Sequence, residues 1–297
     1  MRDYTSYISC LPYRDWGENA YVFLPVFFDK HLLDLGYIIP TVVVYVSLCF
    51  ATSGIRLFDN VYDLDTDESH SKKCKIPIIF GYVRKLIGYV LVLLCFFISF
   101  AIIEIGDISQ IARRGVMGIT LLYIVLNIAY RIKLKQIAII DVFVTSVCSV
   151  LQILLGGFAT GIQLTHWIIL MFFLLSLFMA IAKCRDEVVF YEKMVIKTKD
   201  NKPCYNAAFL NQAMGLVAII MMVCYIMYTV SPEVIERFQC SYLYVTSIFV
   251  FACILRYLQL IFVDSKQGNP TRVLLKDNYV RACIVGWIGV FSYIIYF

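Results

Sequence analysis

Acidic residues recur at helical spacing between positions 59 and 67, where they could bind a metal ion. Asp59, Asp63 and Asp67 stand four residues apart, and Asn60 follows the first of them. On a helix, residues at i, i+4 and i+8 fall on one face. Carboxylates on one face repel one another unless a cation lies among them, and Mg²⁺ prefers such oxygen ligands while sharing a substrate's phosphates. The spacing predicts a Mg²⁺ site formed by Asp59, Asn60, Asp63 and Asp67.

Lysines follow the acidic residues closely. Lys72, Lys73 and Lys75 would add positive charge, and together with Mg²⁺ they would neutralise a diphosphate group. A hydrophobic run ends just before the acids, so the pattern indicates chemistry with a diphosphate leaving group at a membrane. The alternative is a solvated acidic loop, which the regular spacing and the adjoining apolar run argue against. These residues do not identify the group that is transferred.

The composition is that of an integral membrane protein. Of the 297 residues, 61% are hydrophobic and 16% are charged, and the mean hydropathy is +0.79, whereas soluble domains are about half apolar and about a quarter charged. The 11 cysteines are scattered without CxxC or zinc spacing, which favours free buried thiols. The net charge of +5 gives no reason to expect a nucleic-acid partner.

Nine apolar stretches are long enough to form membrane-spanning helices. None shows sustained alternation, which disfavours a β-barrel. We therefore expect an all-α polytopic membrane bundle of about nine transmembrane helices, with residues 1–297 forming one integral-membrane domain. The first stretch is the weakest because Asp29, Lys30 and Asp34 crowd its end. The stretches are 18–33, 36–58, 86–104, 115–132, 137–157, 165–184, 208–229, 238–262 and 279–296.

The distribution of basic residues predicts which loops face the cytoplasm. The N-terminus and the loops after even-numbered stretches hold nearly all of the 26 Lys and Arg residues. The positive-inside rule then places the N-terminus and these loops in the cytoplasm and the C-terminus outside. The acidic segment falls on the cytoplasmic face as well. The loops of the other face carry only Lys30, Arg113, Arg114 and Arg237.

The acidic segment resembles the first aspartate-rich motif, N-D-x-x-D-x-x-x-D, of the UbiA superfamily of intramembrane prenyltransferases. Here the first two letters are reversed, so either Asp59 or Asn60 could make the first metal contact. The closer resemblance is to the branch of decaprenyl-phosphate phosphoribosyltransferases, whose motif continues to H-P-x-K-R-x-R-P-I-x-x-G. The residues in register with that motif are Asp63, Asp67, His70, Lys73, Pro77, Ile78 and Gly81.

The resemblance extends over almost the whole chain. The stretch W-G-E-N, Trp16 to Asn19, resembles the branch's W-V-K-N, and Gln152 stands where the branch has arginine. The stretch AYRIKLKQIAIID, residues 129–141, resembles A-Y-S-x-x-L-K-x-x-x-x-x-D. The resemblance marks these residues as candidates for substrate binding: His70, Lys73, Tyr130, Lys135, Asp141, Arg185 and Arg256.

A second motif favours the phosphoribosyl branch. Most prenyltransferases of the superfamily carry another D-x-x-x-D motif after the sixth span, whereas AKCRDEVVFYEK, residues 182–193, resembles the branch's K-R-x-x-E. Lys183 and Glu187 match this motif and share a helix face. Arg185 could supply the guanidinium that Cys184 lacks. The expected catalytic residues are Asp63, Asp67, Lys183 and Glu187.

Several of these candidates have simpler explanations. Lys183 and Lys135 could follow the positive-inside rule, and Tyr130 could be an aromatic residue of the membrane interface. Asp141 could cap a helix, and Arg256 could extend from a span toward the membrane surface.

The resemblance implies a Mg²⁺-dependent phosphoribosyltransferase of the bacterial plasma membrane. It would transfer 5-phosphoribose from 5-phosphoribosyl 1-diphosphate to a polyprenyl phosphate, with release of diphosphate, in cell-envelope polysaccharide synthesis. Its partners would be these substrates and membrane lipid, and a homo-oligomer stays open. One alternative is a UbiA-type prenyltransferase that uses a prenyl diphosphate donor and an aromatic or lipid acceptor. Another is a transporter or lipid-binding scaffold, which would tolerate loss of the acidic residues.

Overall fold

The computed structural model describes residues 16–66, 82–194, 205–263, 274 and 276–296. Within these ranges the chain folds into helices joined by short connections, and none of the described residues lies in a β-strand. Three predicted site residues, Asp67, His70 and Lys73, lie outside these ranges.

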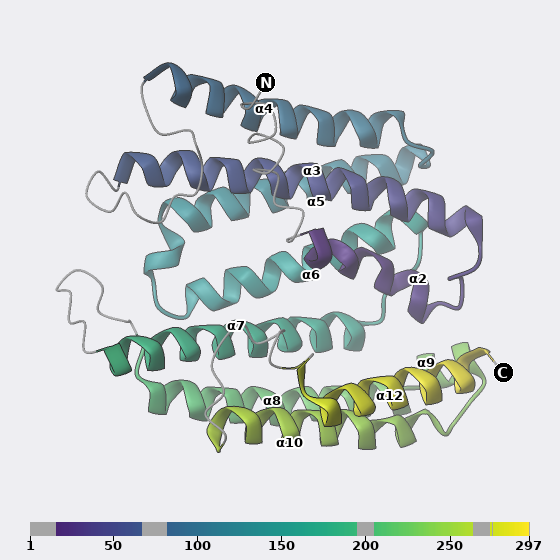
Figure 1. Cartoon of the computed structure of the whole chain (residues 1–297). Helices are drawn as coiled ribbons and strands as arrows, with labels where there is room; N and C mark the ends of the chain where they lie inside the picture. The colour runs from purple at the N-terminus through teal and green to yellow at the C-terminus, as the bar shows by residue number, and fades with distance from the viewer. Residues whose placement is uncertain (1–15, 67–81, 195–204, 264–273, 275, 297) are drawn as a thin grey trace. The chain divides into compact units, whose positions relative to one another are not determined.

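The helices confirm the predicted all-α membrane fold (Figure 1). Among the described residues, seven helices are long and apolar enough to cross a membrane, so the protein is an integral membrane protein. The helices are η1 (Trp16–Phe23), α2 (Leu24–Phe28), α3 (Leu35–Thr66), α4 (Tyr82–Ile105), α5 (Gln110–Ile132), η2 (Leu134–Gln136), α6 (Ile140–Thr160), α7 (His166–Met194), α8 (Ala207–Val230), α9 (Pro232–Phe238), η3 (Leu243–Thr246), α10 (Ser247–Phe262) and α12 (Asn278–Tyr296).

The first predicted span, 18–33, forms two short helices instead of one long helix. The 3₁₀-helix η1 has 8 residues and α2 has 5, whereas a spanning helix needs about 20. Pro25 lies in the first turn of α2, and the helix ends at Phe28, with Asp29 as its C-cap. Lys30 then adopts a positive φ of 64°, which an α-helix cannot continue. The last predicted span, 279–296, corresponds to α12.

The chain divides into two compact units, and the first comprises Met1–Lys135 and Leu151–Leu164. It contains η1 to α5, the first two residues of η2 and the second half of α6. Small residues allow α3 and α4 to pack closely along their length. The Ser47 hydroxyl on α3 donates to the Ser99 carbonyl on α4 at 2.9 Å, and a Cβ at Gly54 would meet the Phe96 ring at 2.6 Å. This packing fixes the helix that carries the acidic residues.

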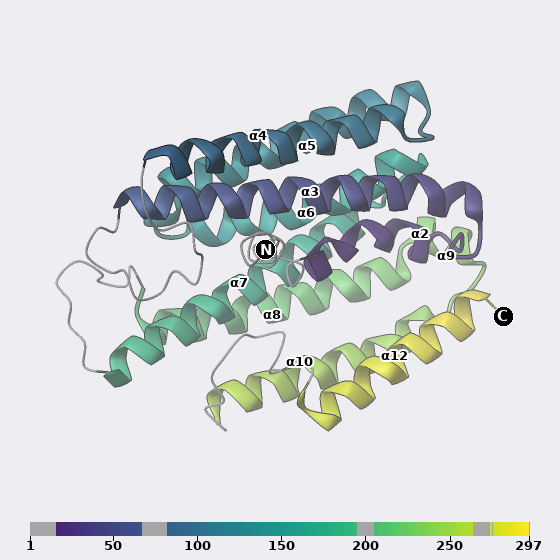
Figure 2. The ribbon, with the colours of Figure 1, turned by 45° about the horizontal axis from the view of Figure 1, so that its top comes forward.

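The second unit comprises Gln136–Val150 and Thr165–Phe297. Its core lies between α7, α8 and α10, where Phe178, Met214, Met221 and Tyr257 are buried. Helices α10 and α12 lie side by side (Figure 2). The predicted single domain over residues 1–297 stays a prediction.

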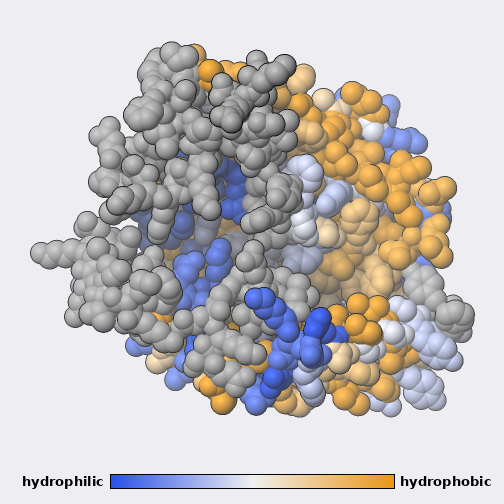
Figure 3. Space-filling model, viewed as in Figure 1, coloured by the Kyte–Doolittle hydropathy of each residue, from blue (hydrophilic) through white to orange (hydrophobic). Residues whose placement is uncertain are grey.

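Large apolar side chains are exposed on the outer faces of several helices. Phe97 on α4 is 75% exposed, and Ile219 on α8 is 68% exposed. Hydrophobic side chains accordingly cover a broad area of the face shown in Figure 3. Exposed apolar area of this kind is unfavourable in water and indicates contact with membrane lipid.

Candidate functional site

The end of α3 places the first acidic residues along one helix. Because α3 continues to Thr66, Asp59, Asn60 and Asp63 all lie on helical backbone, as their spacing predicts. The side chains of Asp59 and Asn60 are partly buried, and the side chain of Asp63 lies outside the described part of the chain. The backbone therefore brings Asp59 and Asp63 to one face, one turn apart.

Arg131 joins this group from the last turn of α5. Its Nε lies 3.5 Å from Oδ1 of Asp59, and the two side chains are 18% and 19% exposed. Arg131 was not predicted as a site residue, because its sequence position explains it as a basic residue of a cytoplasmic loop. It directly follows Tyr130, which was a candidate for substrate binding. A partly buried ion pair is screened less than an exposed one. Arg131 thus balances the charge of Asp59 and places a guanidinium beside the acidic segment.

Two other candidates lie near Arg131 in the sequence. Tyr130 is partly buried in the last turn of α5, and Lys135 is exposed in η2. Both are positioned by the same helix end as Arg131, so these three residues belong to one end of the first unit.

The W-G-E-N stretch packs against the middle of α3, two turns before Asp59. Trp16 Nε1 donates to the Ser53 hydroxyl at 3.2 Å, and Asn19 Nδ2 donates to the Thr52 hydroxyl at 3.1 Å. Gln152 on α6 donates to Asn19 Oδ1 at 3.2 Å. Trp16 and Asn19, which match the branch's motif, and Gln152, which replaces its arginine, therefore make polar contacts that converge on the middle of α3.

In the second unit, α7 separates the residues of the second motif onto different faces. Lys183 and Glu187 are exposed, whereas Arg185 and Asp186 are buried. A step of two residues turns a helix by about 200°, so Arg185 points away from Lys183. Arg185 therefore does not supply the missing guanidinium on the Lys183 face, contrary to the expectation from sequence.

The Arg185 guanidinium is instead held between three helices. Its Nε donates to Asn211 Oδ1 on α8 at 3.1 Å, and its Nη2 donates to the Ile261 carbonyl on α10 at 3.2 Å. Its Nη1 lies 3.5 Å from Oδ1 of Asp186. Through these hydrogen bonds the guanidinium connects α7 to α8 and α10. This placement favours a structural role for Arg185 over substrate binding.

Asp141 accepts hydrogen bonds at the start of α6. Its Oδ1 accepts from the Val142 backbone N–H at 2.7 Å and from the Tyr205 hydroxyl at 2.5 Å. The Cys184 thiol donates to its Oδ2 at 3.7 Å. Tyr205 was not among the site residues predicted from the sequence, although it begins a Y-x-x-x-F-L stretch that loosely resembles the phosphoribosyl branch. Asp141 thus connects α6, α7 and Tyr205, which lies two residues before α8.

The Tyr205 hydroxyl also accepts a hydrogen bond from the Ile139 backbone N–H. Burial, followed by the hydrogen bond to the Asp141 carboxylate, raises the pKa of Tyr205 above its ordinary value. The phenol is therefore protonated at neutral pH and acts as the donor to Asp141.

Arg256 on α10 holds the start of α12. Its Nη2 and Nε lie 2.9 and 3.4 Å from the two carboxylate oxygens of Asp277. Asp277 Oδ1 also accepts from the backbone N–H groups of Tyr279 and Val280, as a helix N-cap does. This geometry favours a structural role for Arg256.

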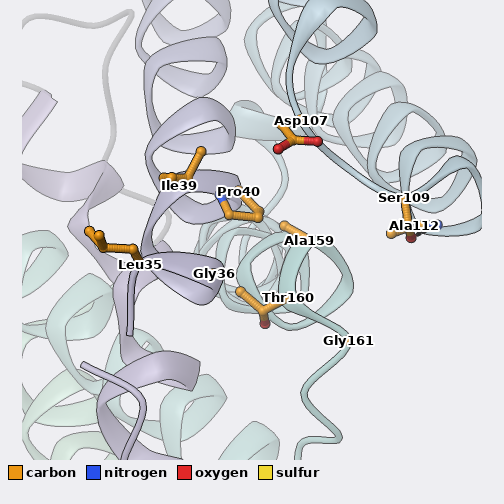
Figure 4. Close-up of a pocket in the computed structure, with 10 residues that line it drawn as sticks. All are labelled: Leu35, Gly36, Ile39, Pro40, Asp107, Ser109, Ala112, Ala159, Thr160 and Gly161. Atoms are coloured by element: carbon orange, nitrogen blue, oxygen red, sulfur yellow. Dashed lines mark hydrogen bonds between the residues drawn. The ribbon is translucent and has the colours of Figure 1, made fainter. Parts of the chain in front are cut away.

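A cavity of about 360 Å³ lies at the opposite end of α3 (Figure 4). Its lining residues come from the start of α3, the α4–α5 connection, the first turn of α5 and the end of α6. None of them is a predicted site residue, and Asp107 is the only charged one. The lining residues are Leu35, Gly36, Ile39, Pro40, Asp107, Ser109, Ala112, Ala159, Thr160 and Gly161.

The donor atoms at the end of α3 fit a Mg²⁺ ion by their chemistry. Asp59 and Asn60 offer carboxylate and amide oxygens, which Mg²⁺ prefers. Over the described ranges, no three His, Cys, Asp or Glu side chains gather in a way that could hold a metal. Because the side chain of Asp63 and all of Asp67 lie outside those ranges, the Mg²⁺ site stays a prediction.

Comparisons with known proteins agree on one family. The sequence profile of the UbiA prenyltransferase family matches residues 30–276. A decaprenyl-phosphate phosphoribosyltransferase from Mycolicibacterium smegmatis is 29% identical over 86% of this chain and 80% of its own length. A protein of the same name from Corynebacterium glutamicum is 24% identical over 95% of this chain and 84% of its own length.

A solved structure has the same fold. A UbiA homolog from Archaeoglobus fulgidus, bound to DMAPP and Mg²⁺, superimposes with a TM-score of 0.63. The match covers 94% of this chain and 97% of that one at 16% sequence identity. At this identity the similarity shows the fold alone.

Proposed function

Because the chain belongs to the UbiA prenyltransferase family, we propose that it is a membrane phosphoribosyltransferase. It transfers 5-phosphoribose from 5-phosphoribosyl 1-diphosphate to a polyprenyl phosphate and releases diphosphate. The observation that carries this proposal is the extent of the likeness to the decaprenyl-phosphate phosphoribosyltransferases, which spans 86% and 95% of this chain. The site residues then have to bind a diphosphate and an anionic lipid.

The donor diphosphate binds at the end of α3 in this proposal. Asp63 and Asp67, with Asn60 or Asp59, hold the Mg²⁺ ion. When bound, the ion supplies positive charge that stabilises the leaving diphosphate. Arg131 adds a guanidinium at the same helix end, because its Nε lies 3.5 Å from Asp59. Asp59 already has this cationic neighbour, so Asn60 and Asp63 are the stronger ligand candidates.

The acceptor needs little activation. A polyprenyl phosphate is already anionic at neutral pH, so no strong general base is required for attack on C1 of the ribose. In the second unit, Lys183 is exposed and can bind an anionic group. Glu187 is also exposed and lies one turn further on the same face, at the spacing of an i, i+4 pair with Lys183.

Conversion of the labelled donor tests this proposal. Purified protein in detergent is supplied with 5-phosphoribosyl 1-diphosphate carrying a label in the ribose, a polyprenyl phosphate and Mg²⁺. We expect the label to appear in a lipid-extractable product, with diphosphate released in equal amount. Failure to form a lipid-linked pentose phosphate would exclude the proposed reaction.

One observation favours a second candidate function. The solved structure with the same fold contains DMAPP, a prenyl diphosphate, together with Mg²⁺. A prenyl-transfer reaction would consume a prenyl diphosphate and transfer its hydrocarbon chain to an aromatic or lipid acceptor. The same assay with labelled prenyl diphosphate tests this reaction. Prenyl transfer would move the label to an aromatic or lipid acceptor and release diphosphate.

A further inference from the structure

A buried amide pair joins four segments of the first unit. Asn19 of η1 is fully buried, and Gln152 of α6 is 6% exposed. Gln152 Nε2 donates to Asn19 Oδ1 and to the Tyr123 hydroxyl on α5, both at 3.2 Å. Asn19 Nδ2 donates to the Thr52 hydroxyl on α3 at 3.1 Å. The pair therefore connects η1, α3, α5 and α6 through side-chain hydrogen bonds.

These contacts restrict how the helices can slide past one another. Thr52, Tyr123 and Gln152 lie within membrane-spanning helices, where no water replaces a lost hydrogen bond. A shift of one helix along its axis would leave a buried amide without its partner, which is costly in a low-dielectric interior. The network therefore favours a single register of α3 against α5.

The register set by the network is also the one that brings Asp59 to Arg131. Asp59 lies seven residues after Thr52 on α3, and Arg131 lies eight residues after Tyr123 on α5. These steps are rises of about 10 and 12 Å in the same direction along the two helices. The amide network and the Asp59–Arg131 ion pair thus occupy successive levels of the same helix pair.

A close backbone contact fixes η1 next to the amide pair. Gly156 lies one turn after Gln152 on α6, and a Cβ at this position would lie 2.1 Å from the Val22 carbonyl oxygen. Real side chains do not tolerate that distance, so only glycine permits η1 to lie this close to α6. This contact holds Asn19 in reach of Gln152.

We propose that Asn19 and Gln152 are a positioning pair for Asp59 and Arg131. They set the height of α3 against α5 and, through it, the place of Asp59 and its neighbours relative to Arg131. The consequence for function rests on the proposed binding of Mg²⁺ and diphosphate at this helix end. The pair acts through the helices and does not need to touch the substrate.

An exchange of the two amides tests this proposal. Asn19→Gln and Gln152→Asn each change the reach of the pair by one methylene, and the double variant restores the combined length. The melting temperature is measured at a fixed concentration of inorganic diphosphate while Mg²⁺ is titrated. The readout is the Mg²⁺ concentration that gives half of the maximal rise in melting temperature. Ser47→Ala serves as the matched control, because Ser47 makes an equally buried contact on α3 but faces α4.

We expect each single variant to raise the half-saturating Mg²⁺ concentration by about fivefold or more, since side chains in one hydrogen-bond network are energetically coupled. The double variant should return to within about twofold of the wild type, and Ser47→Ala should leave the value unchanged. Single variants that lose thermal stability but keep the wild-type Mg²⁺ dependence would overturn the positioning role. An equal effect of Ser47→Ala would also overturn it.

A second measurement separates this inference from the proposed function. In a variant with Asp59→Cys and Arg131→Cys, a short bifunctional thiol reagent should link the two positions, as detected by mass spectrometry. Adding Asn19→Gln should lower the yield of this link several-fold, whatever the protein binds. An unchanged yield would overturn the inference, whereas a wild-type protein that shows no response to Mg²⁺ and diphosphate would overturn only the proposed function.

Discussion

At the scale of single residues, the contacts separate candidates that sequence spacing treats alike. Lys183 and Glu187 are exposed on α7, whereas Arg185 is buried among α7, α8 and α10. The helical period could have indicated this difference, because residues two apart lie on nearly opposite faces. Arg131 and Tyr205 could not be found in this way, since their partners Asp59 and Asp141 lie on other helices.

Among the proposed Mg²⁺ ligands that lie on α3, Asp63 is the one on which the site depends most. Asp63→Asn removes one negative charge while it keeps the shape of the side chain, so we expect turnover to fall by about 100-fold or more, as for lost groups that stabilise a leaving charge. Asp107→Asn is the control, because Asp107 lines the cavity at the other end of α3. The measurement is product formation at saturating Mg²⁺, and near-normal turnover of Asp63→Asn would remove this residue from the site.

Arg131 is predicted to contribute to donor binding through its charge. Arg131→Ala leaves Asp59 without its neighbouring guanidinium, so we expect the KM for the donor to rise by about tenfold, in line with the loss of one charge-assisted contact. Arg114→Ala, an exposed arginine at the opposite end of α5, should have no effect. Equal KM values for the two variants would contradict the role given to Arg131.

At the scale of helices, the connection of Tyr205 to Asp141 predicts a pH dependence of stability. Folding raises the pKa of Tyr205, so the folded protein binds this proton more tightly than the unfolded chain. The resulting stabilisation is fully present below the ordinary tyrosine pKa of about 10 and is lost as the pH rises through the folded-state pKa. The wild type should therefore lose thermal stability above about pH 10.

Tyr205→Phe should be less stable than the wild type at pH 7 by about 1.5–3 kcal/mol, the usual contribution of a hydrogen bond to a charged group. It should also lack the part of the alkaline loss that Tyr205 causes. Tyr242→Phe is the control, because Tyr242 is 69% exposed. Melting temperatures measured from pH 7 to 11 give the stability difference at pH 7 and the loss at alkaline pH. If the melting temperatures of wild type and Tyr205→Phe fall in parallel with pH, the proposed contribution of the Tyr205–Asp141 hydrogen bond is refuted.

The contact of η1 with α6 predicts different effects of alanine at two helix glycines. Gly156→Ala would place a methyl group 2.1 Å from the Val22 carbonyl oxygen, so we expect a loss of about 1–3 kcal/mol, as for other overpacked positions. At Gly118 of α5, a Cβ would meet nothing within 4 Å, and Gly118→Ala should be neutral or stabilising by up to about 1 kcal/mol. Chemical denaturation in detergent measures both, and equal stabilities would contradict the close approach.

The same helices show what hydropathy can and cannot predict. The long apolar stretches became helices because a spanning segment must satisfy its own backbone hydrogen bonds. The first stretch was apolar enough to suggest a span, but Pro25 and the charges from Asp29 onward divide and end it. Its actual role depends on Asn19 and Gln152, which are 133 positions apart in the sequence. No local pattern reveals such a pairing.

At the scale of the whole molecule, the family and the fold agree with the resemblance seen in the sequence. The family profile covers residues 30–276, and the helices have the fold of a UbiA homolog. The sequence could predict this much because motif spacing and hydropathy extend over most of the chain. Placement of the bundle in the membrane, with the N-terminus in the cytoplasm, stays a prediction from the distribution of Lys and Arg.

Labelling of single cysteines tests that orientation. In a cysteine-free background, a cysteine in place of exposed Lys135 should react with a membrane-impermeant thiol reagent only after the cells are opened. A cysteine in place of Glu104, at the other end of the first unit's helices, should react in intact cells. The opposite pattern would reverse the orientation and place the acidic segment outside the cytoplasm.

The identity of the donor is the central claim, and ligand-induced thermal stabilisation tests it most directly. A ligand that binds only the folded protein raises its melting temperature according to its concentration and affinity. The measurement compares equal concentrations of 5-phosphoribosyl 1-diphosphate and a prenyl diphosphate, each with Mg²⁺. We predict the larger shift with the phosphoribosyl donor and loss of that shift in Asp63→Asn. A larger shift with the prenyl diphosphate would contradict the proposed function and identify the protein as a prenyltransferase.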